Sequence, residues 1–139
     1  NNNNEFVNEI FPFNIKENTY DIVICFESLE HVKEDRLMLD LMLHSLKSNG
    51  YLLISFPNQE NHPLEKNPHK FHYRHYSHFE FISMIPAPFV IDNWYGQNIY
   101  EFTDNLINTH CLINEQNMYP SEKKEGQVNL YIIRRNSIL

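Results

Sequence analysis

The amino-acid sequence predicts an α/β fold, and three features of its first half support this prediction. Residues 20–26 and 51–56 are almost continuously apolar, as expected of strands that are buried on both faces. Residues 32–48, which lie between them, have apolar side chains at helical spacing. A strand, a helix and a strand in this order form a βαβ unit, so the two strands are expected to run parallel with a right-handed crossover.

The chain before the first strand is expected to be irregular. Residues 1–9 form a polar N-terminal segment, and Pro12 argues against a helix in the apolar cluster that follows. The helix over 32–48 is supported by one apolar stripe with the spacing i, i+3, i+4 and i+7, formed by Leu39, Met42, Leu43 and Leu46. Gly50 is expected to stop this helix.

The second half of the chain is expected to contain shorter elements. Ser77 has the sequence context of a helix N-cap, because Glu80 follows three residues later. In order, we expect a loop over 59–76, a helix that ends at 85, a strand over 89–94, a short helix around 100–107 and a last strand over 128–133. The expected strands are too few to give both apolar strands, 20–26 and 51–56, a neighbour on each edge and cover on each face. We therefore expect the N-terminal segment or another chain to supply neighbours, or the sequence to be a piece of a larger protein.

Composition argues against several classes of protein. The net charge of −7 argues against a general nucleic-acid binder. No apolar run reaches the roughly 20 residues that span a bilayer. Cys25 and Cys111 are too few for a disulfide framework, so we expect reduced thiols and a cytoplasmic location. The glycines at positions 50, 96 and 126 are too far apart to form a glycine-rich phosphate-binding loop.

The candidates for chemistry follow the two apolar strands, because ligands of open parallel sheets bind beyond the carboxyl ends of the strands. Glu27, Glu30 and His31 are spaced so that they can converge on one side of a tight turn. A histidine from the loop after the second strand would complete a site for Mg, Mn, Fe or Zn. The alternative is structural: the glutamates accept hydrogen bonds at the start of the helix, and His31 is a buried, hydrogen-bonded histidine.

The histidine-rich loop offers further candidates. Histidines recur at every third residue, at His69, His72, His75 and His78, which allows either a dedicated metal site or a loop without one. Arg74, within this run, is expected to pair with acidic groups of the candidate site, to bind an anionic substrate or to lie in solvent.

Several passages between residues 10 and 97 resemble class I S-adenosylmethionine-dependent methyltransferases. YDIVICFESLEHV, at 20–32, is similar to the fourth strand of that fold and the turn after it. LKSNGYLLISFPN, at 46–58, and HYRHYS, at 72–77, resemble the next strand and the entry into the following helix.

The resemblance implies a Rossmann-like methyltransferase sheet, mostly parallel with an antiparallel last strand. It also implies a sheet that is incomplete at its N-terminal side. The family's first strand with its G-x-G-x-G loop, and the acidic residue that holds the cofactor ribose, have no counterpart in the sequence. Residues 10–139 are therefore expected to form the C-terminal portion of such a domain.

The resemblance further implies methyl transfer from S-adenosylmethionine to a hydroxyl group of a small molecule, sugar or RNA. A small molecule or glycan is favoured over nucleic acid, and no membrane is expected as a partner. Cys25, Phe26 and Glu27 match positions that border the methionine end of the cofactor. His31 or His72 is expected to act as a general base, because imidazole titrates near neutral pH.

Two subgroups of the family use a divalent cation on an E-x-x-E-H turn and a later histidine. The matching positions here are Glu27, Glu30, His31 and His72, which implies a Mg or Zn site that lowers the pKa of the acceptor hydroxyl group. Two other functions stay open. One is a non-catalytic remnant of the fold that forms a homodimer or binds a partner chain through its sheet edge. The other is a metal-dependent hydrolase, for which the sequence has no nucleophile motif.

Overall fold

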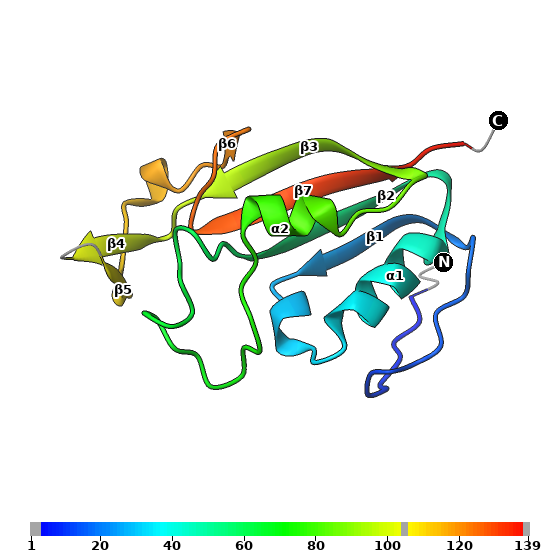
Figure 1. Cartoon of the computed structure of the whole chain (residues 1–139), viewed down its shortest axis with the longest axis horizontal. Helices are drawn as coiled ribbons and strands as arrows, with labels where there is room; N and C mark the ends of the chain where they lie inside the picture. Colours follow the sequence, from blue (N-terminus) through cyan, green and yellow to red (C-terminus); the bar gives the residue numbers. More distant parts are fainter. Residues whose placement is uncertain (1–3, 104–105, 138–139) are drawn as a thin grey trace.

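The computed structural model describes residues 4–103 and 106–137 and contains a five-stranded sheet with two helices packed on one face (Figure 1). The strand order is β1 (Tyr20–Phe26), β2 (Leu46–Pro57), β7 (Val128–Arg135), β3 (Phe89–Gln97) and β6 (Ser121–Glu122). The helices are α1 (Asp35–Ser45) and α2 (His78–Ser83), and short 3-10 turns lie at Leu29–His31 and Glu115–Asn117. Strands β4 (Tyr100–Thr103) and β5 (Leu106–Leu112) form a separate hairpin.

The prediction of a mostly parallel sheet is wrong. Strands β1 and β2 pair in parallel, as the βαβ pattern predicts, but the pairings β2–β7, β7–β3 and β3–β6 are antiparallel. The reason is the position of β7, which returns between β2 and β3 and runs opposite to both. The expected antiparallel direction of the last strand is confirmed. Strands β1, β2 and β3 share one direction, so their carboxyl ends lie at the same end of the sheet.

The helix predicted over 32–48 is shorter in the structure. It begins at Asp35, because the chain before it forms a 3-10 turn, and β2 begins directly after it at Leu46. Asn49, with a φ of 62°, adopts the left-handed conformation expected of a helix-stopping glycine. Gly50 is instead required where backbone carbonyl groups approach it closely, because a Cβ there would lie 2.9 Å from the carbonyl oxygen of Lys47.

The short helix predicted around 100–107 is wrong, because the chain forms the hairpin of β4 and β5 there. Residues 104–105 of that prediction lie outside the described residues. The buried Gln127 side chain holds the entry to β4: its Oε1 accepts hydrogen bonds from the backbone amides of Ile99 and Tyr100. Its Nε2 donates to the carbonyl oxygen of Tyr100. These contacts satisfy backbone groups at the entry to the hairpin.

The hydrophobic core lies between the two helices and one face of the sheet. Leu43 of α1 and Phe81 of α2 are buried there together with Phe56 of β2. The predicted cap of α2 is confirmed, since Oγ of Ser77 accepts a hydrogen bond from the backbone amide of Glu80 at 3.1 Å. Among the described residues, no helix is long and apolar enough to cross a membrane.

The opposite face of the sheet is exposed along β1 in the part of the chain that the structure describes. Ile22, Ile24 and Phe26 are 58%, 61% and 45% exposed, so the prediction that the first strand is buried on both faces is wrong. Successive side chains of a strand point to opposite faces, so Cys25 lies in the core while its neighbours face outward. No described element covers these neighbours, and β1 is paired only with β2.

Candidate functional site

A cavity of about 500 Å³ lies beyond the carboxyl ends of β1 and β2, next to the residues that the sequence singles out. Five histidines contribute to its wall, and we call it the histidine pocket. They come from the turn after β1 and from the loop between β2 and α2: His31, His62, His69, His72 and His75. Glu27, Glu30 and Tyr100 also line it. Imidazole and carboxylate side chains in one cavity are suitable ligands for divalent metals.

Glu30 has a buried carboxylate that the described residues leave partly unsatisfied. The residue is 1% exposed, and its Oε2 has no hydrogen-bond partner. Its Oε1 lies 3.7 Å from Nε2 of His31. Burial, reinforced by the charge of Glu27, raises the pKa of Glu30 to about 7. A buried carboxylate oxygen is costly unless a proton or a cation satisfies it, so this group indicates a ligand.

The hydrogen bonding of His31 leaves a free lone pair that faces Glu30. Nδ1 of His31 lies 3.0 Å from the carbonyl oxygen of Phe71. A carbonyl oxygen can only accept, so the neutral ring carries its proton on Nδ1. Nε2 then directs its lone pair toward the Glu30 carboxylate. Two electron-rich atoms that face each other repel unless a proton or a cation lies between them.

His72 is oriented by a chain of hydrogen bonds that ends on a backbone carbonyl. Nδ1 of His72 lies 2.7 Å from Nε2 of His75, and Nδ1 of His75 lies 2.6 Å from the carbonyl oxygen of His62. Because that carbonyl accepts from Nδ1 of His75, Nε2 of the neutral His75 ring accepts from Nδ1 of His72. Burial, followed by the neighbouring histidines, lowers the pKa of His72 to about 4. The His72 ring is therefore neutral at pH 7, with a free lone pair on Nε2.

The structure brings together three of the four residues expected to bind a metal. One ligand atom from each of Glu30, His31 and His72 lies within 4.8 Å of the other two. Glu27 is outside this group, and its Oε1 accepts a hydrogen bond from Oγ of Ser55 at 2.8 Å. Partial withdrawal from water raises the pKa of Glu27, against the opposing effects of Ser55 and His31. Two free imidazole lone pairs and an unpaired carboxylate oxygen fit a divalent cation.

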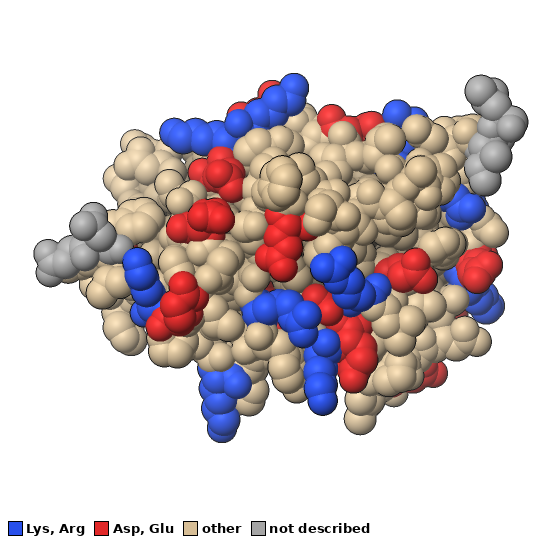
Figure 2. Space-filling view, in the orientation of Figure 1, with Lys and Arg blue, Asp and Glu red and all other residues tan. Residues whose placement is uncertain are grey.

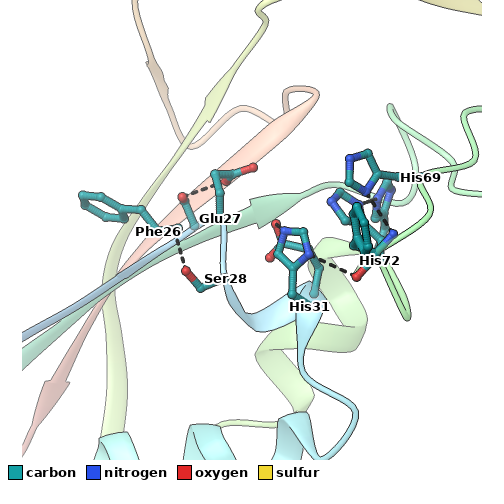
Figure 3. Close-up of polar contacts among 10 residues, drawn as sticks. Phe26, Glu27, Ser28, His31, His69 and His72 are labelled. Carbon is teal, nitrogen blue, oxygen red and sulfur yellow. Dashed lines mark hydrogen bonds and ion pairs between the residues drawn. The ribbon is translucent and has the colours of Figure 1, made fainter. Parts of the chain in front are cut away.

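Glu27 lies between the histidine pocket and a second cavity of about 450 Å³, which we call the Phe26 cavity. Figure 3 shows the ring of Phe26 pointing away from the histidines, with Glu27 between them. Cys25, the third residue expected at the cofactor, lines neither cavity, because its side chain lies in the core. Burial raises the pKa of the Cys25 thiol to about 11. Of the three expected cofactor residues, two therefore direct side chains to this end of the sheet.

The run of histidines at every third residue separates in the structure. His69, His72 and His75 line the histidine pocket, whereas Nδ1 of His78 is hydrogen-bonded to the hydroxyl group of Tyr131. Sequence reasoning misses His62, whose ring centre lies 5.1 Å from that of His75 and whose Nδ1 is buried without a partner. The abundance of histidine in this loop is its only signal.

Asp35 attaches the histidine-bearing loop to α1. The Asp35 carboxylate is buried and accepts hydrogen bonds from Nη1 of Arg74 at 3.1 Å and from the hydroxyl group of Tyr76 at 2.8 Å. Arg74 therefore pairs with an acidic group of the fold and does not line the histidine pocket. Because Arg74 and Tyr76 flank His75, the two contacts hold this part of the loop beside the pocket.

Comparison with protein families gives a match over residues 2–89 to a model described as "Methyltransferase domain". The matched segment is more than half of the chain and contains both sides of the candidate metal site. A comparison with curated protein sequences gave no match.

Solved structures with a similar fold include several methyltransferases. An S-adenosylmethionine-dependent methyltransferase from Thermotoga maritima, described as a possible histamine N-methyltransferase, is 16% identical, with a TM-score of 0.67 over 89% of this chain and 60% of that chain. A candidate methyltransferase from Bacillus halodurans is 15% identical, with a TM-score of 0.60 over 92% and 68% of the two chains. A complex between a methyltransferase activator and a candidate methyltransferase of Haloferax volcanii gives 14% identity and a TM-score of 0.60 over 94% and 59%. These identities indicate a shared fold, and this chain spans about 60% of the first neighbour's length.

Proposed function

The chain belongs to the methyltransferase-domain family, and we propose that its two adjoining cavities serve S-adenosylmethionine-dependent methylation of a hydroxyl group. The observation that carries the proposal is the position of Glu27 between them. In this arrangement the Phe26 cavity receives the methionine end of the cofactor. The histidine pocket receives the acceptor on the other side of Glu27.

The residues at the boundary have complementary tasks. The cofactor supplies a methyl group on a positively charged sulfur, which is already activated for transfer. The Glu27 carboxylate attracts that positive charge, and the exposed ring of Phe26 provides an apolar wall beside it. The remaining tasks of this chain are to align the acceptor oxygen and to remove its proton. The free Nε2 lone pair of His31 is suited to accept that proton, whereas the pKa of His72, which burial lowers to about 4, makes that ring a weak base at neutral pH.

We further propose that a divalent cation, Mg or Zn, binds Glu30, His31 and His72. The unpaired oxygen of Glu30 and the two free imidazole lone pairs support this assignment. A bound cation would lower the pKa of an acceptor hydroxyl group next to it. Histidine acting as a base without a cation is the alternative, and full activity in the presence of a chelator would favour it.

A small molecule or a glycan is the proposed acceptor. The described residues that line the histidine pocket include no lysine or arginine. Figure 2 shows acidic and basic side chains interspersed on the visible face, where a nucleic-acid partner would require a continuous basic surface. The cysteines Cys25 and Cys111 are unpaired, which supports the proposal of a cytoplasmic location.

Weak but saturable binding of S-adenosylmethionine is the expected result of a calorimetric titration of this chain, because the glycine-rich loop and the ribose-binding acid of the family have no counterpart in the sequence. Glu27→Gln should weaken binding about 10-fold, because a hydrogen bond or ion pair to a charged group contributes roughly 1.5 kcal/mol. Glu115→Gln, which changes an exposed glutamate that lines neither cavity, is the matched control. An absence of saturable binding at millimolar cofactor, or equal affinity of both variants, would contradict the proposed cofactor position.

A second candidate function is favoured by the open sheet face, namely a dimerisation module. Ile22, Ile24 and Phe26 form an exposed apolar row on a strand that is paired on one edge only. Such a strand is a template for pairing with another chain. If a second copy of this chain covers it, light scattering should show a dimer that Ile24→Glu converts to a monomer. Phe79→Glu, at an exposed position of α2, should leave the dimer intact, and a monomer at every concentration would exclude this function.

A further inference from the structure

In the hydrogen-bonded chain from His72 through His75 to the backbone of His62, the carbonyl group at the His62 end determines which atoms donate and which accept. The carbonyl oxygen of His62 cannot donate, so it fixes the proton of His75 on Nδ1 at a distance of 2.6 Å. Nε2 of His75 then accepts from Nδ1 of His72 at 2.7 Å. The tautomer of His72 is therefore decided by a backbone atom ten residues earlier in the sequence, acting through one intervening side chain.

We propose that His75 is a positioning residue, which holds His72 with its proton on Nδ1 and so presents Nε2 to a divalent transition metal shared with Glu30 and His31. This inference rests on the metal site proposed above and narrows the class of metal. Two imidazole nitrogens and one carboxylate favour Zn or Co over Mg, because Mg prefers oxygen ligands and retains several waters. Partners that orient a metal-bound histidine through its other nitrogen are a general requirement of such sites.

The surroundings of His75 suit this role. The residue is 5% exposed, and its neighbours Arg74 and Tyr76 are both hydrogen-bonded to the buried Asp35. The His75 ring therefore has little freedom to turn away from His72. Without it, Nδ1 of His72 loses its acceptor, and the ring is free to rotate or to move its proton to Nε2, where the proton competes with a metal.

His69 is close to His72 but lacks the geometry for this task. The centres of the two rings lie 3.9 Å apart at an angle of 34°, which is a packing contact. Nδ1 of His69 accepts a hydrogen bond from the backbone amide of Phe71 at 3.4 Å. Neither contact determines which nitrogen of His72 carries the proton.

Two measurements on the full chain test this role. Long-range proton–nitrogen NMR of the metal-free protein reports the tautomer of His72, and calorimetry reports the affinities for Zn and Co. His75→Phe should abolish the Nδ1-protonated tautomer and lower both affinities about 10- to 100-fold. His75→Gln should restore most of the loss, because its amide oxygen can accept from His72 and its amino group can donate to the carbonyl of His62. His44→Phe, at a half-exposed position on α1, is the matched control and should change neither measurement.

The outcomes separate this inference from the metal site on which it rests. The role of His75 would be overturned if Nε2 of His72 carried the proton in the unsubstituted protein. It would also be overturned if His75→Phe changed neither the tautomer of His72 nor the metal affinity. Absence of Zn and Co binding by the unsubstituted protein, with the tautomer still dependent on His75, would instead overturn the metal site. Tighter binding of Mg than of Zn would overturn the assignment of the metal class.

Discussion

Glu30→Gln is expected to abolish the binding of divalent metal and, at the same time, to stabilise the metal-free protein. The substitution removes the one carboxylate of the proposed ligand set, so Zn affinity should fall by at least two orders of magnitude. It also removes a buried charge whose Oε2 has no partner, and a neutral amide can donate to the free Nε2 of His31. Relieving a buried unsatisfied group of this kind should raise the free energy of unfolding by about 1–3 kcal/mol. Calorimetry and denaturant unfolding measure the two effects separately.

The pH dependence of stability gives this prediction a second readout. Burial raises the pKa of Glu30 from 4.5 to about 7, so the folded chain binds this proton more tightly than the unfolded chain. The resulting stabilisation is complete below pH 4.5 and is lost as the pH rises through about 7. The unsubstituted metal-free protein should therefore lose stability over this range relative to Glu30→Gln. Glu34→Gln is the control, at the exposed N-cap position of α1, where the side chain makes no capping hydrogen bond; it should leave metal affinity unchanged and change stability by less than about 1 kcal/mol.

Asp35→Ala is expected to be the most destabilising of the substitutions considered. The Asp35 side chain accepts hydrogen bonds from Arg74, from Tyr76 and from the backbone amide of Arg36. Its loss leaves the Tyr76 hydroxyl group buried without a partner, whereas the half-exposed Arg74 can be rehydrated. We therefore expect a loss of about 2–3 kcal/mol, most of it the cost of leaving the buried Tyr76 hydroxyl group without a hydrogen-bond partner. This corresponds to a fall in Tm of roughly 10 °C.

The same substitution should also weaken metal binding, because Arg74 and Tyr76 hold the loop on both sides of His75. Asp40→Ala removes an exposed carboxylate of the same helix and should cost about 0.5 kcal/mol or less. Tyr76→Phe keeps the contact between Asp35 and Arg74 and should cost about 1 kcal/mol. If Asp35→Ala were no more destabilising than Asp40→Ala, Asp35 would not anchor the loop.

Predictions from the sequence succeeded where a structural element is specified by residues that are neighbours in the sequence. The run of consecutive β-branched residues in β1 and the cap at Ser77 are local features, and the structure contains both the strand and the cap. The same holds for Glu30 and His31, whose spacing places them on one turn. Local patterns failed at residues 100–107, because the backbone there is held by Gln127, a residue far away in the sequence that lies directly before β7.

Neighbouring residues were enough to predict a βαβ unit whose strand ends carry glutamate and histidine, because apolar periodicity and spacing are local properties. Packing between distant segments decided that Glu27 turns to Ser55, while Oε2 of Glu30 has no partner among the described residues. It also decided that β7 lies between β2 and β3. Both depend on which distant segments meet in space, where burial and the available hydrogen-bond partners select one arrangement among several that the local sequence allows.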